Sequence, residues 1–361
     1  MKKNLFLWMF FAFGVVSFSS CSEDDDNGGG GAGDGGATSC YIVNQGSWGY
    51  NNASLQVYDA NLGVASLPDC NNDIFYNANG ELLGDLAQDL LWVGDKLFVT
   101  VSSSQKLEIL DATGKRVRQY TFAAEGAQPR YMATDGNKVY VTNYDGNVYV
   151  YNAATGDSIT KIYSGSYPEG ISCCNGSLIV NNSNWGGYGG GEASVAVINV
   201  ASGESKLITE NVCNPYTQSV VCDGKVYIID SGNYMDILPA IYRVDVANEN
   251  LVKVIDNATF LTSCGDYIYF ANSSWNYATN AYDYSPLYKM DVATDEKSEL
   301  LSADKMNGVY SLDVNPATGD IYIGFSLSAD EFGTMRVYSS DGEQKGVFEV
   351  GYYTSGARFH N

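Results

Sequence analysis

The stretch DGNKVYVTNYDGNVYVYNAATG, from Asp135 to Gly156, is the clearest copy of a unit that recurs along the chain. Residues 138–143 and 148–152 each alternate apolar with polar side chains, and the short segment 144–147 between them carries turn-forming residues. Such a pattern predicts a β-hairpin. The rest of the chain repeats this unit with insertions.

Six further copies align on Tyr140, with successive spacings of 57, 42, 39, 48, 42 and 53 residues. Periods of about 40 to 50 residues with several short strands are typical of propeller blades. Leucine-rich repeats have a shorter period, and separate sandwiches would need linkers. The sequence therefore predicts an all-β fold, a seven-bladed β-propeller, whose aligned residues are Tyr41, Phe98, Tyr140, Ile179, Tyr227, Tyr269 and Tyr322.

The two ends of the repeat region predict how the ring closes. The first copy begins at Tyr41, on what is the second strand of every other blade, whereas a spare segment from Thr354 to Phe359 follows the last copy. We expect this C-terminal strand to complete the first blade, because closure removes exposed sheet edges. A single propeller domain would then span residues 39–361.

Asp or Asn ends the second hairpin strand in six of the seven copies. These side chains accept hydrogen bonds from the following backbone and so begin turns. We expect this structural role, rather than catalysis, for Asp59, Asp111, Asn152, Asn199, Asp245 and Asp291.

The N-terminal residues 1–20 predict a secretory signal peptide, with Lys2 and Lys3 before an apolar run. Small residues directly before Cys21 favour cleavage there and lipidation of this cysteine; an ordinary cleaved signal is the alternative. Residues 21–38 are acidic and Gly-rich, which indicates a flexible tether. We expect a protein held on the membrane by a lipid anchor.

Charge disfavours one class of partner. The chain has 20 basic and 42 acidic residues, a formal net charge of −22. Phosphate backbones are repelled by such a surface. Nucleic acid is therefore not an expected partner.

Seven cysteines remain after Cys21. Three of them each lie five positions before an aligned repeat residue, which predicts small buried residues of equivalent strands rather than ligands: Cys174, Cys222 and Cys264. A disulfide among Cys40, Cys70 and Cys213 stays open in an exported protein.

The loops of a propeller divide between two faces. With four strands A to D in a blade, the A–B and C–D hairpins lie on one face, and the B–C loops and D-to-A crossovers on the other, here called the loop face. Three of the four Trp residues outside the signal fall in B–C loops. Aromatic side chains on loops suit ligand recognition, although each could instead pack over its own blade. The candidate ligand-binding residues are Trp48, Tyr50, Asn51, Arg130, Tyr144, Trp185, Tyr188, Tyr234, Trp275 and Tyr277.

An Asn or Asp follows strand B in five copies. We expect these residues to cap the loop backbone rather than to contact ligand. They are Asn44, Asn143, Asn182, Asp230 and Asn272.

Catalytic motifs are scarce. His360 is the single histidine and the penultimate residue, so a Ser-His-Asp triad or a multi-His metal centre is excluded by count. The glycine run 186–191 lies between strands rather than before a helix, unlike a phosphate cradle. We expect a binding protein, not an enzyme, with no metal and no cofactor.

The signal with its acidic tail, the opening segment YIVNQG at 41–46 and the repeat VYVTN at 139–143 carry a resemblance. Together they resemble the seven-bladed surface lipoproteins of Bacteroides-type bacteria, with YncE-like repeats, and in particular the BtuG-like proteins. The resemblance implies capture of cobalamin at the cell surface, and its transfer to a TonB-dependent outer-membrane transporter of BtuB type.

Three ligand classes follow from the loop face. Cobalamin or another corrinoid comes first, because flat aromatics and neutral amides suit an amide-edged corrin. A glycan is the alternative, since Trp and Tyr platforms also suit sugar rings. A ferric siderophore is disfavoured, because these complexes are often anionic and the face offers few cations, Arg130 and Lys305 among them.

Overall fold

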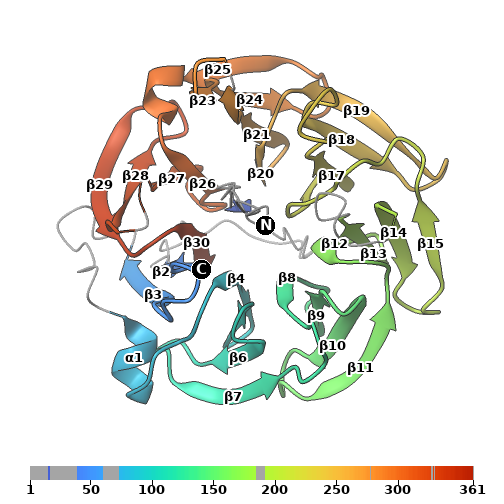
Figure 1. The fold of residues 1–361 in the computed structure, drawn as a ribbon, viewed down its shortest axis with the longest axis vertical. Coiled ribbons are helices and arrows are strands. Elements are labelled where there is room, and N and C mark those ends of the chain that lie inside the picture. Colours follow the sequence, from blue (N-terminus) through green and yellow to red (C-terminus); the bar gives the residue numbers. More distant parts are fainter. Residues whose placement is uncertain are drawn as a thin grey trace, which may run out of the picture.

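Seven sheets surround one axis in the computed structural model, as Figure 1 shows. The structure describes residues 15–16, 39–59, 73–183, 192–276, 278–326, 328 and 330–360. Within these ranges no helix is long and apolar enough to cross a membrane. The prediction of an all-β, seven-bladed propeller is confirmed.

The blades follow one another along the chain, with strand A innermost. Blade 2 holds β4 (Ala87–Val93), β5 (Lys96–Val101), β6 (Lys106–Leu110) and β7 (Arg116–Thr121). Blade 3 holds β8 (Pro129–Thr134), β9 (Lys138–Asn143), β10 (Asn147–Asn152) and β11 (Ser158–Tyr163). Blade 4 holds β12 (Pro168–Cys174), β13 (Ser177–Asn182), β14 (Ser194–Asn199) and β15 (Ser205–Ile208).

The later blades keep the same order. Blade 5 holds β16 (Val220–Cys222), β17 (Lys225–Asp230), β18 (Ala240–Asp245) and β19 (Asn250–Asp256). Blade 6 holds β20 (Phe260–Cys264), β21 (Tyr267–Ala271), β24 (Leu287–Asp291) and β25 (Lys297–Leu301). Blade 7 holds β26 (Val309–Val314), β27 (Ile321–Phe325), β28 (Gly333–Tyr338) and β29 (Gln344–Val350), and the two-residue β1 (Val15–Val16) pairs parallel with β26.

The C-terminal strand closes the ring as predicted. In blade 1, β2 (Ser39–Asn44) lies between β3 (Ser54–Asp59) and β30 (Thr354–His360). The pairing of β2 with β30 is antiparallel and places Cys40 opposite Phe359. In Figure 1 the red β30 lies beside the blue β2, so the two ends of the propeller share one sheet.

Three elements depart from a plain blade. The helix α1 (Ile74–Asn79) precedes blade 2, and its N-terminus is capped by Asp73, which accepts a hydrogen bond of 3.0 Å from the backbone N of Phe75. The B–C connection of blade 6 forms its own hairpin, β22 (Ser273–Asn276) with β23 (Ala281–Tyr284). A short 3₁₀ helix covers Ala303–Met306. Insertions into the repeat thus acquire secondary structure of their own.

Apolar clusters hold neighbouring blades together. Alternate side chains of β9 face opposite neighbours, so that Val139 packs with Phe98 of blade 2, and Tyr140 with Leu178 of blade 4. Each pair of adjacent blades shares one such cluster of described residues. Burying one large apolar side chain contributes about 1.5–3 kcal/mol, and the ring closes only if all of these interfaces form. This explains the alternation seen in the sequence.

The repeated cysteines connect blades through weak hydrogen bonds. The thiols of Cys174 and Cys222 lie 3.3 Å from the carbonyl oxygens of Gly224 and Gly265, each in the next blade. Cys264 lies 4.0 Å from the carbonyl oxygen of Asn315 in the same way. The prediction of equivalent structural positions is confirmed, although Cys174 and Cys264 are only partly buried.

The other cysteine and turn predictions have mixed outcomes. Cys40 and Cys213 are free thiols, and Cys70 lies outside the described residues. The predicted turns form, because the side chains of the second-strand Asp and Asn residues accept backbone hydrogen bonds at Asp111, Asn152, Asn199, Asp245 and Asp291. The side chain of Asp59 is not among those described.

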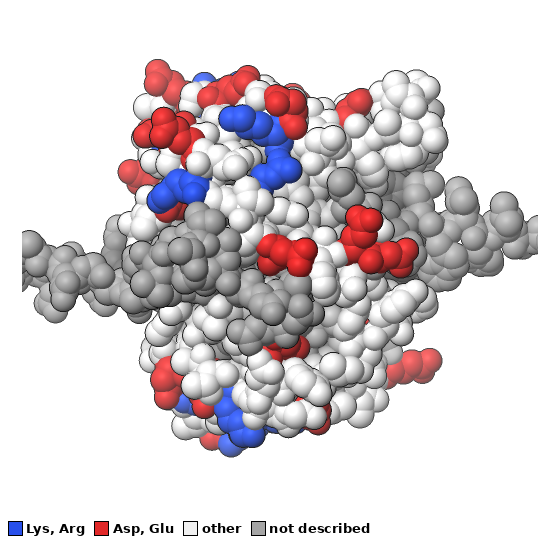
Figure 2. Space-filling view, turned by 90° about the vertical axis from the view of Figure 1, so that its left-hand side faces the viewer, with Lys and Arg blue, Asp and Glu red and all other residues white. Residues whose placement is uncertain are grey.

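Charged side chains of both signs lie interspersed on the side of the disc drawn in Figure 2. Several of the basic groups on the outer strands form ion pairs, such as Arg118 with Asp157 and Lys206 with Glu249. Exposed pairs of this kind contribute little to stability. The fold therefore depends on its buried interfaces rather than on its surface charges.

A buried cluster of three charged side chains joins the ends of the ring. Arg358 on β30 lies between Asp89 on β4 and Asp313 on β26, at nitrogen-to-oxygen distances of 2.7 and 3.3 Å. Its Nε also donates to the carbonyl oxygen of Leu90 at 3.0 Å, and Asp313 accepts from the backbone N of Ala357 at 2.8 Å. The three charged groups are buried. They link blades 1, 2 and 7.

The stability contribution of this cluster should fall as the pH rises from about 4 to about 7. Burial raises the pKa of Asp313 from the ordinary 3.8 to about 7, although Arg358 opposes the shift. Because the folded state holds this proton more tightly than the unfolded chain does, the contribution is fully present below the unfolded pKa and is lost as the pH rises through the folded pKa.

Urea denaturation at about pH 5 and about pH 8 measures this effect. In the variant Asp313→Asn, residue 313 stays uncharged at both values, so we expect the wild type to lose more stability between them than the variant loses. Equal losses in the two proteins would contradict the assignment.

Candidate functional site

Seven residues occupy equivalent positions at or just before the start of the innermost strands, on the loop face. In five blades a β-bulge interrupts the pairing of strand A at this point, for example between Pro129 and Met132 of β8. Bulges insert one extra residue and redirect side chains. We call these seven buried residues the axial ring: Ser355, Gln88, Arg130, Glu169, Thr217, Thr259 and Tyr310, in blade order.

Hydrogen bonds from the preceding blade hold the backbone of the axial ring. Thr100 donates to the carbonyl oxygen of Arg130 at 2.6 Å, and Thr142 donates to that of Glu169 at 2.6 Å. Asn181 donates to the carbonyl oxygen of Thr217 at 2.7 Å. Thr100, Thr142 and Asn181 occupy equivalent positions of strand B, and each binds the backbone of the next blade. The backbone at Arg130, Glu169 and Thr217 is therefore held in place before any ligand binds.

Blades 4 and 5 approach each other closely at Gly170, directly after Glu169. A Cβ at Gly170 would lie 2.3 Å from the carbonyl oxygen of Thr217, closer than real contacts allow. The absence of a side chain at this position lets the two backbones pack together.

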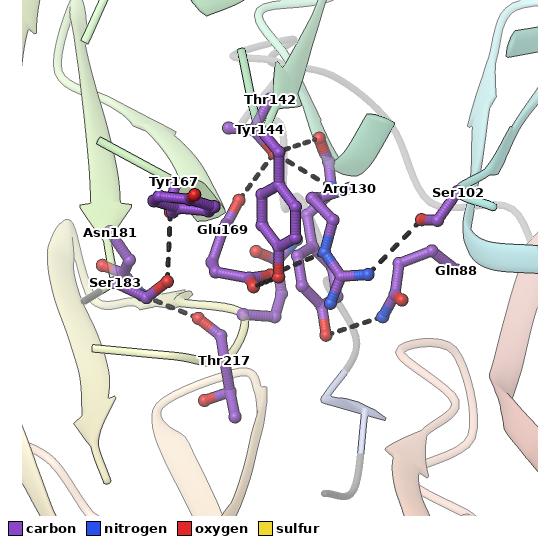
Figure 3. A network of polar contacts seen from close by, with 12 residues as sticks. Gln88, Ser102, Arg130, Thr142, Tyr144, Tyr167, Glu169, Asn181, Ser183 and Thr217 are labelled. Atoms are coloured by element: carbon purple, nitrogen blue, oxygen red, sulfur yellow. Dashed lines mark hydrogen bonds and ion pairs between the residues drawn. The ribbon is translucent and has the colours of Figure 1, made fainter. Parts of the chain in front are cut away.

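The axial ring contains one buried ion pair, between blades 3 and 4 (Figure 3). The Arg130 Nε donates to Glu169 Oε2 at 2.8 Å, and the Tyr144 hydroxyl donates to Glu169 Oε1. The guanidinium carbon of Arg130 lies 4.9 Å from the Tyr144 ring centre and 5.8 Å from that of Tyr131. Burial alone lowers the pKa of Arg130, but Glu169 and the tyrosine oxygens outweigh it and raise that pKa overall. Arg130 is therefore a permanent cation.

A chain of amides and hydroxyls continues around the ring from blade 7 to blade 3. Tyr310 donates to Gln45 Oε1 at 2.7 Å, Gln45 Nε2 lies 3.5 Å from Gln88 Oε1, and Gln88 donates to the Tyr131 hydroxyl at 3.0 Å. Burial raises the pKa of Tyr131 and of Tyr310. Both hydroxyls are therefore neutral at physiological pH, and this arc offers uncharged donors and acceptors.

In blade 5, three backbone N–H groups donate to the Asp230 carboxylate. They belong to Cys213, Asn214 and Gly232, at 2.7, 2.8 and 2.9 Å. Asn214 Nδ2 in turn lies 3.1 Å from the hydroxyl of Tyr234. The predicted candidate Tyr234 is thus half-buried at the start of its loop, tied to the crossover from blade 4.

The predicted ligand-binding residues lie in different settings. Arg130 and Tyr144 meet in the buried ion-pair cluster, whereas Trp48 and Tyr50 are 59% and 70% exposed and Asn51 is exposed beside them. Trp275 belongs to the β22–β23 hairpin and packs edge-on against Tyr282, with ring centres 5.1 Å apart. The candidates Trp185, Tyr188 and Tyr277, and the lipidation candidate Cys21, lie outside the described residues.

The Asn and Asp residues that follow strand B have structural roles, as expected. Asn44 donates to Gln56 at 2.8 Å and accepts from Thr354 at 2.9 Å, and Asn182 donates to the carbonyl oxygen of Ser164 at 2.8 Å. All five are buried: Asn44, Asn143, Asn182, Asp230 and Asn272. Their amides and carboxylates hold loops and crossovers in place.

Exposed apolar side chains gather in three of the B–C loops. Met235 is the most exposed of them, at 82%. Eight other large apolar side chains are exposed elsewhere on the described surface, most of them singly on outer strands. Exposed apolar groups that lie close together, as in the loops of blades 1 and 5, mark an interaction surface. The described members are Trp48 and Tyr50 in blade 1, Met235, Ile237 and Leu238 in blade 5, and Phe332 in blade 7.

The sequence analysis did not foresee the partnership of Glu169 with Arg130, nor the arc through Tyr310, Gln88 and Tyr131. One signal was available. Pro129 and Pro168 precede the two charged residues at the same repeat position. Equivalent prolines predict equivalent starts of strand A, and hence neighbouring side chains on adjacent blades.

A closed seven-bladed β-propeller, with a buried polar ring at the loop end of its axis, is the class of protein that this fold and site define. The chain belongs to the family described as a domain of unknown function (DUF5074), whose model matches residues 38–359. No curated protein matches the sequence.

Solved structures share the fold. A quinonprotein alcohol dehydrogenase-like protein from Bacteroides thetaiotaomicron superimposes with a TM-score of 0.62 at 14% identity, over 89% of this chain and 78% of that one. Hydrazine synthase from Kuenenia stuttgartiensis gives a TM-score of 0.57 at 16% identity, over 76% of this chain and 95% of that one. At these identities the similarity extends to the fold alone.

Proposed function

We propose that the protein binds cobalamin or a related corrinoid on its loop face and delivers it to an outer-membrane transporter of BtuB type. The observation that carries this proposal is the combination of exposed apolar side chains on the B–C loops with a neutral, hydrogen-bonding arc at the axis. A corrinoid has the same combination, a broad apolar ring edged with carboxamides. The resemblance to BtuG-like lipoproteins supports the same ligand.

The geometry of the loop face favours binding over chemistry. The ion pair between Arg130 and Glu169 in the axial ring carries no net charge. Burial raises the pKa of Tyr131 and of Tyr310, so both hydroxyls stay protonated. The single histidine, His360, stacks on Trp92 at 4.3 Å, at the far end of β30 from the loop face. We therefore propose a carrier rather than an enzyme, anchored at the cell surface through Cys21.

Titration of the purified protein with cyanocobalamin tests the proposal, by heat and by change of the corrin absorption spectrum. We expect a dissociation constant below about 1 μM, the range that scavenging of a scarce nutrient requires. No binding at micromolar concentrations by either method would overturn the proposal.

The variants Trp48→Ala and Tyr50→Ala are each expected to weaken cobalamin binding by about 10-fold, the usual effect of removing an aromatic anchor. The matched control is Tyr163→Ala, because Tyr163 is 66% exposed but lies on the outermost strand of blade 3. Its affinity should equal that of the wild type. Unchanged affinity in both loop variants would place the ligand elsewhere on the molecule.

A glycan is the second candidate. The edge-on pair of Trp275 and Tyr282, together with the exposed rings of Trp48 and Tyr50, suits the flat apolar faces of sugars. A glycan array run with the same protein separates the two functions. Saturable glycan binding, together with no cobalamin binding, would favour this candidate.

A further inference from the structure

Arg130 has a hydrogen-bonding group that the described protein does not use. Its Nε donates to Glu169 at 2.8 Å, and its Nη1 lies 3.4 Å from Ser102 Oγ, at the long end of the range. Its Nη2 has no hydrogen-bond partner among the described residues. This side chain is 9% exposed, and Nη2 is not among the fully buried side-chain atoms that lack a partner, so it keeps contact with solvent. The second edge of the guanidinium is therefore available to a ligand.

The groups around this edge carry no net charge. The Glu169 carboxylate offsets the Arg130 cation, and the neighbouring Tyr131, Gln88 and Ser102 are neutral. An anionic ligand would meet Glu169 as well as Arg130, on a protein with a net charge of −22. A neutral carbonyl oxygen accepts the same hydrogen bond without this repulsion. The electrostatics favour an uncharged acceptor.

The guanidinium is held in place before any ligand arrives. Thr100 bonds the backbone of Arg130, Glu169 holds one edge of its fork, and the ring of Tyr144 lies 4.9 Å away. A preorganised donor loses little freedom on binding. Its hydrogen bond should therefore contribute strongly to affinity and to the orientation of the ligand.

We infer that the free edge of Arg130 binds a carboxamide carbonyl of the ligand, so that the ligand lies over the axial ring rather than on the outer loops alone. This inference rests on the proposed function, because a corrinoid supplies the carboxamides. It adds a specific recognition point at the junction of blades 3 and 4.

The test is cobalamin affinity in the variant Arg130→Lys. The lysine ammonium keeps a positive charge beside Glu169, but it lacks the second pair of planar N–H donors that the guanidinium offers. We expect an increase in the dissociation constant of about 10-fold or more, as for loss of a hydrogen bond from a charged donor. The control Arg118→Lys changes an arginine on the outer strand β7 and should leave the affinity unchanged.

A second variant guards against a folding defect. Arg130→Met combined with Glu169→Met removes both charges together and leaves neither one buried alone. It should show the same loss of affinity, with an unchanged far-UV circular dichroism spectrum. Wild-type affinity should also vary by less than about 3-fold between 0.05 and 0.5 M NaCl, because the recognised group is neutral.

The outcomes separate the two proposals. No cobalamin binding by the wild type would overturn both. Binding by the wild type, with unchanged affinity in folded Arg130→Lys and in the double variant, would overturn only the Arg130 assignment. A steep salt dependence that persists in Arg130→Lys, which keeps the charge, but disappears in the double variant would identify an anionic group and overturn the carboxamide.

Discussion

Replacing Arg358 by Met is expected to lower the free energy of unfolding by about 3–5 kcal/mol, the usual cost of breaking a buried ion pair from one side. The substitution leaves Asp89 and Asp313 buried without their cation, 2.7 and 3.3 Å from its former position. It also removes a donor to the carbonyl oxygen of Leu90. Urea denaturation followed by tryptophan fluorescence measures the loss.

Arg118→Met is the matched control, since Arg118 pairs with Asp157 at the exposed edge of the disc. It should cost far less stability than the Arg358 substitution, because an exposed ion pair contributes little. Adding Asp89→Asn and Asp313→Asn to the Arg358 variant should restore part of the stability, because no carboxylate then remains buried alone. Equal effects of the Arg358 and Arg118 substitutions would show that the cluster does not hold the ring closed.

Replacing Glu169 by Leu is expected to cost a similar amount, about 3–5 kcal/mol, because it leaves the Arg130 guanidinium buried without its counterion. Glu169 is fully buried, and its carboxylate accepts from both Arg130 and Tyr144. The loss should appear as a lower urea midpoint with an unchanged slope.

The double variant Glu169→Leu with Arg130→Met supplies the comparison. Apolar replacement of a whole buried pair is often neutral or stabilising, so most of the loss should be recovered. If the single and double variants are equally unstable, the damage comes from packing around residue 169 rather than from the unpaired charge.

The repeat pattern was enough to predict the architecture. Tyr140 and its six counterparts all lie on strand B, and the segment after Tyr353 forms the closing strand. Alternation identifies strands because each blade buries both faces against its neighbours. The helix α1 and the β22–β23 hairpin were not predicted, because they lie in insertions that do not share the repeat pattern.

The candidate site was predicted only in part. Loop aromatics such as Trp48 and Tyr50 were recognisable, because their residue type and their place in a long loop are both visible in the sequence. The pairing of Arg130 with Glu169 was not, because it depends on a bulge that turns each side chain toward the adjacent blade. No local rule places a bulge in one strand relative to its neighbour.

The sequence by itself determined the number of blades, the order of their strands and the closure by residues 354–359. These follow from short-range alternation and from a period repeated seven times. Only the tertiary structure decided which polar side chains meet at the axis, such as Arg358 with Asp89, 269 residues apart. Their contacts depend on how neighbouring sheets are aligned and on how deeply the side chains are buried. Burial decides whether an ion pair stabilises the fold or costs stability. Neither the alignment nor the burial can be predicted from the order of the residues.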